Sequence, residues 1–572
     1  MRYLRMLTNA LLGGLLGAAF VTILVLQLNR QIPLSWSTAA SLYSPVALFY
    51  TPHLTLAFYA LLIAREALAR RPLSPGWLSI RILSWVGLMV VGAAASLMWV
   101  NFVRFDLALD DDSHRRLGAA AGATTLCAVL LLVIAVVHYS FGRRGSRVGA
   151  TLLTLTLLAS LGYPLAARGW GAPRPLAARA INLSPLSGPA VEGGRVTILA
   201  VDGASLDYIA QRVGEGRLPA FGRLLEGGVS MYLETLRPTH PAPIWTAVAT
   251  GKYPPQTGVR AAARYEYDPS QEPIELLPDF CFSHALVNFG LLRTVPIQSN
   301  AVRARPLWTI LSSQRVSAGV VGWPVTAPAS PLRGFLVTDR FDPWRMPDDP
   351  DGLTVSGAPS DVVLRAMAIA SGPLAVRAGS VEDPPFSPDA WRREIALQLR
   401  DEYRPRLLAV RYEGVGRAGR LYLRHARPRA FGGTGQSSEA RLGAILDGHY
   451  AFVDAEIAQV LETMGSDDVL LVVSGFGMEP VGLGRRFLAR ALGQPDVSGT
   501  HEHAPDGFLL AYGGSVRTGR AHLGSIVDVT PTVLYLLGLP VARDMDGLAR
   551  TDLFKPTFTS ARPIAFIPSY ER

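Results

Sequence analysis

The sequence DVLLVVSGFGMEP, residues 468–480, joins an apolar run to a glycine-containing turn. The run at 469–473 holds only valine and leucine, which is typical of a strand covered on both faces of a sheet. Comparable runs, separated by helix-like stretches, lie at 196–201, 316–323, 405–412 and 507–512. Apolar strands that alternate with helices predict an α/β domain with a mainly parallel sheet sandwiched by helices.

The N-terminal part of the chain has the composition of a membrane protein. Of the 572 residues 49% are hydrophobic, which is too apolar for a purely soluble protein of this length. Stretches free of charged residues, each near the roughly 20 residues that cross a bilayer, run at 6–29, 41–64, 82–103, 117–142 and 148–167. We therefore expect an all-α bundle of about five transmembrane helices in residues 1–167. Pro45, Pro52 and His53 interrupt the second stretch, so a re-entrant or interfacial segment is the alternative there.

The placement of arginine predicts the orientation of these helices. Arginines cluster before the first stretch, between the second and third, and between the fourth and fifth, which are loops on one side of the membrane. Because such clusters stay in the cytoplasm, everything after residue 167 is expected outside it. We thus expect a multi-pass protein of the cytoplasmic (inner) membrane of a bacterium, with the lipid bilayer as a partner and a periplasmic C-terminal domain.

The rest of the chain divides into three parts. Residues 168–194 are rich in Pro, Gly and Ala and predict a linker, 195–560 hold the alternating strands, and 561–572 form a C-terminal tail. The formal net charge is +10, but the excess of arginine lies before residue 180, beside the membrane stretches. Since no basic patch or recognition motif remains, we exclude nucleic acid as a partner.

Several motifs follow one another in residues 195–548. The run VTILAV ends in Asp202-Gly203 and is followed by LPAFGRLLEGG, PTHPAPIWTAVATGKYPPQTG, EGVGRAGRLYLRHARP, SGFGMEP and SGTHEHAPDGFLLAYGG. In this order they resemble the motifs of the type I phosphodiesterase and nucleotide pyrophosphatase family of the alkaline phosphatase superfamily. The resemblance implies an alkaline-phosphatase-like fold, hydrolysis of phosphodiesters, a nucleophilic Ser or Thr, and two divalent metals, zinc or manganese.

The position of the family's nucleophile is substituted. In the family this residue lies four positions before a Trp and begins a helix, whose N-terminal amides stabilise the phosphoryl oxygens. Counting back from Trp245 puts Pro241 there, and proline has no hydroxyl with which to form a phosphoenzyme. Thr239 is the fallback nucleophile, and it requires the backbone to slip by two residues.

Most of the metal ligands that the resemblance implies are also substituted. Asp202 matches one ligand, and either His501 or His503 matches the closing His of the family. The other ligand positions are occupied by Gly416, Arg420, Gly475 and Phe476. None of these side chains donates a lone pair to a metal, and arginine adds a permanent cation. We therefore expect no metal cofactor.

These substitutions predict a membrane-anchored, extracytoplasmic pseudoenzyme that binds or scaffolds. Arg420, together with Arg417, would hold a phosphate or another anion in place of the lost metals. Alternatively, Arg420 pairs with Asp202 and only fills the vacancy. A phosphate-containing ligand or an envelope protein is the expected partner.

Two other functions stay open. An active metal-dependent phosphodiesterase or phosphotransferase, acting on envelope lipid or glycan phosphoesters, would need Thr239 and carboxylates recruited from elsewhere, such as Asp207 or Asp447. A membrane transport component would use the acidic loop 110–112 with His114 to bind a cation. A solvated loop is the simpler interpretation of that segment.

Overall fold

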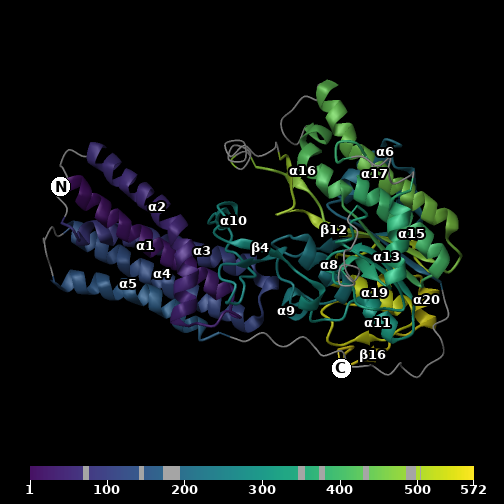
Figure 1. The fold of residues 1–572 in the computed structure, drawn as a ribbon, viewed down its shortest axis with the longest axis horizontal. Coiled ribbons are helices and arrows are strands. Elements are labelled where there is room, and N and C mark those ends of the chain that lie inside the picture. Colours follow the sequence, from purple (N-terminus) through teal and green to yellow (C-terminus); the bar gives the residue numbers. More distant parts are fainter. Residues whose placement is uncertain are drawn as a thin grey trace. The chain divides into compact units, whose positions relative to one another are not determined.

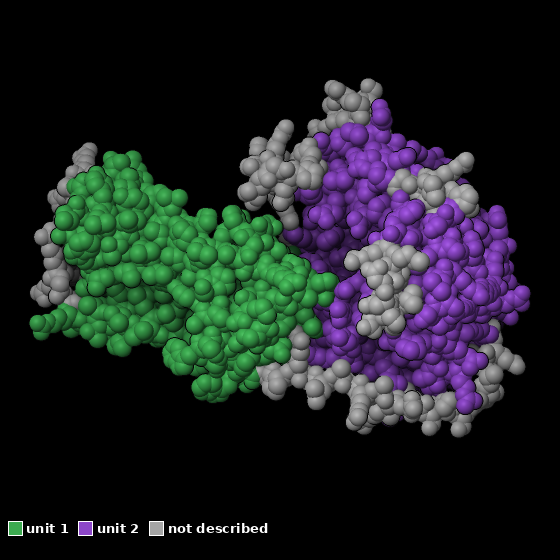
Figure 2. Space-filling view, in the orientation of Figure 1, with its two compact units in different colours: residues 1–175, 263–296 green, residues 176–262, 297–572 purple. Residues whose placement is uncertain are grey.

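The chain folds into two compact units (Figures 1 and 2). The first comprises residues 1–175 and 263–296, and the second comprises residues 176–262 and 297–572. The computed structural model describes residues 1–68, 76–140, 147–171, 194–344, 355–372, 380–384, 386–428, 437–482, 484, 497–502 and 504–571. Most of the linker expected at 168–194 lies outside the described residues.

Five long helices make up most of the first unit. They are α1 (Arg2–Leu28), α2 (Trp36–Leu68), α3 (Ile80–Arg104), α4 (Asp111–Ser140) and α5 (Arg147–Arg168), with the short η1 (Asp106–Ala108) before α4. All five are long and apolar enough to cross a membrane, in agreement with the five stretches expected from the sequence. The second is one helix of 33 residues that continues through Pro45 and Pro52, rather than a broken or re-entrant segment.

Helix α1 is the most buried of the five. A stripe of small residues lets its neighbours approach closely, because a Cβ atom at Gly14 would lie 2.6 Å from the backbone oxygen of Thr51 and one at Gly13 would lie 2.3 Å from Val86. Contacts of this kind between small residues drive the association of helices in membranes, where apolar burial alone gives little preference. The sequence of α1 therefore places it at the centre of the bundle.

Residues 263–296, here called the inserted hairpin, belong to the first unit although second-unit sequence flanks them. Strand β3 (Ala263–Glu266) pairs antiparallel with β4 (Arg293–Pro296), and the short α10 (Ala285–Asn288) lies between them. The boundary expected at 195 assigned this segment to the outer domain. In the structure the segment belongs to the first unit instead. The contacts that hold it there join residues that are 178 and 247 positions apart, and no local sequence pattern reveals such contacts.

The second unit is built on a sheet of ten strands. Its order is β13-β2-β12-β9-β1-β8-β5-β6-β7, with β14 beside β2. The strands are β1 (Val196–Val201), β2 (Val229–Glu234), β5 (Ala318–Trp323), β6 (Gly334–Thr338), β7 (Gly357–Ala358), β8 (Leu407–Tyr412), β9 (Val469–Phe476), β12 (Asp506–Gly513), β13 (Gly519–Arg520) and β14 (Gly524–Ser525). The central strands β9, β1, β8, β5 and β6 run parallel, and β12 runs antiparallel to both of its neighbours. This confirms the predicted α/β fold class.

Helices cover both faces of this sheet (Figure 1). One face carries α6 (Leu206–Gly214), α7 (Pro219–Gly227), α13 (Ser360–Ala370), α15 (Ser387–Tyr403), α16 (Gly414–Ala426) and α17 (Ser437–Thr463). The other carries α8 (Pro241–Thr250), α11 (Leu307–Ser313), α19 (Val529–Leu536) and α20 (Pro556–Ala561). Successive residues of β1 alternate between these faces, so Leu199 and Val201 pack in the first helical layer, as strand geometry requires.

Short elements complete the second unit. They are α9 (Pro254–Thr257), η2 (Ser299–Ala301), β10 (Glu479–Pro480) paired with β11 (Gly499–Thr500), η4 (Ile526–Asp528), η5 (Thr551–Leu553), and β15 (Val541–Ala542) paired with β16 (Phe566–Ile567). The segment expected to be a C-terminal tail contains β16 within its described residues 561–571, and Tyr570 is only 2% exposed. Near its end Glu571 accepts a hydrogen bond from Lys252.

Three central strands end at the same edge of the sheet. In the parallel register Val201 of β1 lies beside Tyr412 of β8, and Ala200 lies beside Val473 of β9. The residues that follow these strands therefore meet at one place. In open α/β sheets this carboxyl edge is where ligands bind.

Candidate functional site

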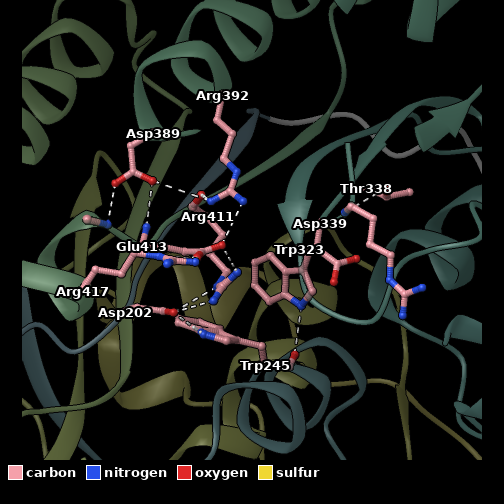
Figure 3. A network of polar contacts seen from close by, with 12 residues as sticks. Asp202, Trp245, Trp323, Thr338, Asp339, Asp389, Arg392, Arg411, Glu413 and Arg417 are labelled. Atoms are coloured by element: carbon pink, nitrogen blue, oxygen red, sulfur yellow. Dashed lines mark hydrogen bonds and ion pairs between the residues drawn. The ribbon is translucent and has the colours of Figure 1, made fainter. Parts of the chain in front are cut away.

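The carboxylate of Asp202, which follows β1, is held by two neighbours (Figure 3). Arg411 of β8 donates from Nη2 to Oδ2 at 2.5 Å and from Nε to Oδ1 at 3.0 Å. Trp245 of α8 donates from its indole nitrogen to Oδ1 at 2.6 Å. Asp202 is 6% exposed, so both partners reach it inside the protein. The guanidinium that pairs with Asp202 is thus that of Arg411, and the pairing with Arg420 considered from the sequence is not the one formed.

Arg411 links Asp202 to a second carboxylate. Its Nη1 donates to Glu413 at 2.8 Å, and Arg392 of α15 donates to the same oxygen of Glu413 at 2.9 Å. Beyond it, both oxygens of Asp389 accept backbone N–H groups, from Glu413 at 2.8 Å and from the following residue at 2.7 Å. Opposite charges therefore alternate along a chain that we call the charged network: Asp202, Arg411, Glu413, Arg392 and Asp389.

The pKa values of the network follow from burial and from these partners. Burial lowers the pKa of Arg411, but the carboxylates of Asp202 and Glu413 outweigh it and raise this pKa above its ordinary value. Burial raises the pKa of Glu413, but Arg411 and Arg392 outweigh it and hold this pKa well below its ordinary value. Only Asp389 is dominated by burial, which raises its pKa to about 6 although Arg392 lowers it. Buried ions are tolerated when each is paired and hydrogen-bonded in this way.

Packing closes the places where the family's metal-binding side chains would project. Phe476, at the end of β9, is 1% exposed, and a Cβ atom on Gly475 would lie 2.4 Å from Cγ2 of Ile244. On the other side of Asp202, a Cβ atom on Gly416 would lie 3.1 Å from the Asp202 Cβ. At both glycine positions the space that a side chain would need is therefore filled by the close packing of α8 and α16 against the sheet.

The imidazole of His501 lies against this packed region. Its ring packs edge-on against Phe476, with 5.3 Å between the ring centres. Burial, followed by the charge of Arg420, lowers the pKa of His501, so the ring is neutral at pH 7. The other candidate, His503, lies outside the described residues. Among the residues that the structure describes, no group of three or more His, Cys, Asp or Glu side chains could hold a metal ion.

The candidate nucleophile positions lie at the start of α8. This helix begins at Pro241, so the position predicted to correspond to the family's Ser or Thr lies at a helix N-terminus. Thr239 is fully buried, and its hydroxyl donates to the backbone oxygen of Leu236 at 3.0 Å. The Thr239 hydroxyl is thus hydrogen-bonded within the loop that precedes α8.

The carboxylates considered as recruited metal ligands have other partners. Asp207 accepts a hydrogen bond from the hydroxyl of Tyr232 at 2.9 Å. Asp447 of α17 accepts from the hydroxyl of Tyr208 at 2.6 Å and from Arg212 at 2.7 Å. Each serves to join helices or a helix and a strand on the surface of the second unit.

The two arginines expected to bind an anion differ in their surroundings. Arg417 donates to Glu413 at 3.0 Å, and its guanidinium lies 5.0 Å from the ring centre of Phe386. Its charge is therefore already matched. Arg420, one turn further along α16, has an exposed side chain, and its backbone oxygen accepts a hydrogen bond from Ser498 at 2.7 Å.

The acidic loop before α4 is internally bonded. Asp110 accepts hydrogen bonds from the backbone and the hydroxyl of Ser113, at 2.9 and 2.7 Å. Asp112 pairs with Arg30 at 2.6 Å and with Arg116 at 3.0 Å. Asp111 and Asp112 form the first turn of α4, so these contacts are those of a helix start with ion pairs rather than of the solvated loop in the simpler interpretation.

Sequence reasoning missed Arg411 and the rest of the charged network. A signal was present, because Arg411 interrupts the apolar strand sequence LLAVRY, and a charge in a strand buried on both faces must have a partner. What the sequence could not reveal is which carboxylate that partner is. The register of β1 beside β8 decides it.

Comparison with known proteins gives one family. The family model described as type I phosphodiesterase / nucleotide pyrophosphatase matches residues 196–514, which is more than half of the chain. Two solved structures of murine ectonucleotide pyrophosphatase/phosphodiesterase 5 also resemble it, one of them an inactive variant in complex with AMP. Each is 14% identical and covers 63% of this chain and 100% of its own, with TM-scores of 0.38 and 0.37. No curated protein matches the chain.

Proposed function

Because this chain belongs to the type I phosphodiesterase / nucleotide pyrophosphatase family, we propose that it is a pseudoenzyme in which a buried ion pair has taken the place of the family's metal centre. It is a membrane-anchored module that binds or scaffolds outside the cytoplasm. The single observation that carries this proposal is the bidentate contact of Arg411 with Asp202.

This contact makes the site unfit for the two metals of the family. A metal on Asp202 would have to displace Arg411 and Trp245 from its two oxygens. It would then lie beside a guanidinium that keeps its positive charge at every accessible pH. Three protein ligands are the usual minimum for a catalytic zinc, and Asp202 and His501 are the matching side chains among the described residues.

The site of this chain also lacks the nucleophile that the family's reaction requires. Without a hydroxyl at Pro241 no covalent phosphoenzyme forms there, and the buried Thr239 hydroxyl donates to a backbone oxygen. Phosphodiester cleavage depends on charge stabilisation by metals or fixed donors, since the uncatalysed reaction is very slow. We therefore expect no turnover above background.

The decisive experiment is metal analysis of the purified full-length protein together with turnover of an aryl phosphodiester, before and after incubation with zinc or manganese. We expect less than one metal per chain and equal background rates in the wild type and the Asp202→Asn variant. Stoichiometric metal with turnover that disappears in Asp202→Asn would overturn the proposal in favour of an active hydrolase.

We further propose that the surface beside this filled site binds an anion through Arg420 alone. The support is its exposed side chain beside the His501 loop, whereas Arg417 is neutralised by Glu413. Inorganic phosphate is the probe: it should raise the melting temperature of the wild type and of Arg417→Ala, but not of Arg420→Ala. No shift at millimolar phosphate, or the same shift in all three proteins, would contradict this role.

The orientation in the membrane is the remaining part of the proposal. Five apolar helices and alternating arginine clusters support a second unit in the periplasm of a bacterium, carried by the inner membrane. A reporter enzyme that works only outside the cytoplasm should be active when fused after the last residue and inactive when fused between α2 and α3. The reverse pattern would refute the orientation.

A further inference from the structure

The inserted hairpin is fixed to the ends of α1 and α3 by two buried asparagines. The side-chain oxygen of Asn29 accepts the backbone N–H groups of Glu275 and Leu276 at 2.8 and 2.9 Å, and its nitrogen donates to the oxygen of Leu276 at 2.7 Å. In α3, Asn101 makes the same pair of contacts with the backbone of Asp279, at 2.8 and 3.3 Å. Both asparagines have no exposed surface. These bonds make the hairpin an integral part of the helical unit.

Beyond these contacts the hairpin descends along α2. The hydroxyl of Tyr50 donates to the backbone oxygen of Cys281 at 2.6 Å, and the ring centres of Phe49 and Phe289 lie 5.5 Å apart. Phe49 and Tyr50 lie inside the uncharged part of α2, 16 and 15 positions before Arg65. At 1.5 Å per residue that is about 24 Å along the helix, less than the roughly 30 Å of hydrocarbon in a bilayer. This part of the hairpin is therefore level with the outer half of the hydrocarbon.

At this level the hairpin presents three phenyl rings outward. Phe280, Phe282 and Phe289 are 59%, 71% and 68% exposed, whereas Cys281 and Ser283 between and beside them are 7% and 1% exposed. Phe280 and Phe282 have φ angles of 62° and 60°, in the left-handed region that bulky residues avoid. An unfavourable backbone is thus used to turn apolar rings away from the protein.

The backbone of residues 285–292, around Phe289, is suited to a surrounding without water. Every N–H group from residue 285 to 292 donates to a backbone oxygen within the hairpin, and β4 pairs with β3 immediately afterwards. The hydroxyl of Ser283 donates to the oxygen of Pro278. Backbone groups at hydrocarbon depth must be satisfied in this way, because no water is present to bond them.

The three rings continue the exposed apolar surface of the adjoining helices. Leu48 and Leu56 of α2 are 67% and 68% exposed, and Val103 of α3 is 73% exposed. On helices that cross a bilayer such a surface faces lipid. We propose that Phe280, Phe282 and Phe289 of the inserted hairpin lie in the outer leaflet, so that the chain, after leaving the membrane, returns to it and contacts the acyl chains. The proposal depends on the five spans and on their proposed orientation, and not on the loss of catalysis.

Spin labelling in lipid vesicles tests this placement. Nitroxide labels are attached to the single replacements Phe282→Cys and Phe289→Cys in the full-length protein, with Ser270→Cys as the matched control. Ser270 is exposed on the same hairpin but precedes the contacts with Asn29. Wild-type protein supplies the labelling blank, since Cys127 and Cys281 are both buried.

Collision with two relaxing reagents gives the readout, because oxygen concentrates in lipid and a nickel chelate stays in water. We expect labels at 282 and 289 to collide with oxygen and to lose collision with nickel, and the label at 270 to do the reverse. Nickel collision at 282 and 289 equal to that at 270 would overturn the proposal. Protection from both reagents would also overturn it, because protein, either a second copy or the second unit, would then cover the rings.

A second measurement covers the case in which a labelled variant does not fold. The triple variant Phe280→Ser, Phe282→Ser, Phe289→Ser removes the three outward rings, and with them the contact of Phe289 with the ring of Phe49 and that of Phe280 with the guanidinium of Arg104. If lipid covers the rings, its melting temperature should fall relative to wild type in vesicles, with a smaller difference in a mild detergent at low micelle concentration. The same difference in both surroundings would count against a lipid contact.

Discussion

Arg411 brings a permanent cation into an apolar strand, and it is stable there because Asp202 and Glu413 lie on either side of it. A pair of this kind is costly to bury and still more costly to break. The pair therefore fills the site with matched charges. Without Arg411, the buried Asp202 would have no opposite charge beside it.

The first prediction concerns this pair. Arg411→Met keeps much of the side-chain volume but leaves Asp202 buried and unpaired, so the free energy of unfolding should fall by about 3–5 kcal/mol. The double variant Arg411→Met, Asp202→Asn removes both charges and should lose less than the single one. Thermal unfolding in detergent measures both. A double variant that is as unstable as the sum of the single variants would show that the two charges are not coupled.

The second prediction is a pH dependence at Asp389. Its pKa in the folded protein is raised by burial to about 6, above its ordinary value. The folded state therefore keeps a proton that the unfolded state has lost, and its contribution to stability, fully present below pH 4, is lost as the pH rises through 6. Relative to Asp389→Asn, the wild type should lose on the order of 2 kcal/mol of stability between pH 4.5 and 7.5.

Melting temperatures of both proteins over that pH range check the prediction. The comparison sets aside titrating groups that do not contact Asp389, such as His501, whose pKa is lowered mainly by burial. A constant difference between the two curves would mean that Asp389 keeps its charge in the folded state down to pH 4.5.

At the residue scale the sequence predicted positions better than partners. Asp202 after one strand and Gly475 near the end of another were placed by apolar runs, and Pro241 at the start of a helix was placed by counting back from Trp245. The partner of Asp202 depends on which strands are neighbours, which is a property of the whole sheet. The sequence therefore did not predict that Arg411 fills the site.

At the scale of elements, α8 and β9 close the site together. Their contact at Ile244 and Gly475 is so tight that any side chain on Gly475 collides with Ile244. Restoring the family's aspartate at this one position would therefore not restore a metal ligand.

The third prediction tests that contact. Gly475→Ala should destabilise the protein by about 1–3 kcal/mol, the usual range for an added group in a packed core. In an Ile244→Ala background, which costs stability by itself, the same change should cost almost nothing, because the space at Cγ2 is then free. A double-mutant cycle from unfolding curves measures the coupling, and equal costs of Gly475→Ala in both backgrounds would contradict it.

The five strands identified from apolar runs are β1, β5, β8, β9 and β12, and each lies within three residues of its expected bounds. The inserted hairpin was not foreseen, because its strands are short and its anchors are single asparagines at helix ends. Amide side chains that bond distant backbone leave no periodic pattern, so they do not stand out in a sequence.

At the scale of the whole molecule, the chain enters the first unit twice. A protein that begins at residue 194 would retain the hairpin but lack Asn29, Asn101 and Tyr50, which bond it. Its apolar side, including Ile274 and Leu277, would then be exposed together with the three outward phenylalanines.

The fourth prediction follows from that exposure. The shortened protein should aggregate or require detergent, because an exposed apolar patch of this kind promotes association. Replacing residues 267–292 by Asn-Gly, which joins antiparallel strands in a tight turn, should make it monomeric in water. Size-exclusion chromatography without detergent distinguishes them, and a monomeric shortened protein with the hairpin intact would refute the expectation.

The long reach of the asparagine anchors also sets an order for biosynthesis. The bond from Asn29 to Leu276 spans 247 residues, which a ribosome adds in roughly 12–50 s at about 5–20 residues per second. During that interval α1 and α3 have been synthesised, but the hairpin to which Asn29 and Asn101 bond has not. Strands β8 and β9 are translated later still, so these contacts become possible after synthesis of the first strand of the sheet and before synthesis of its centre.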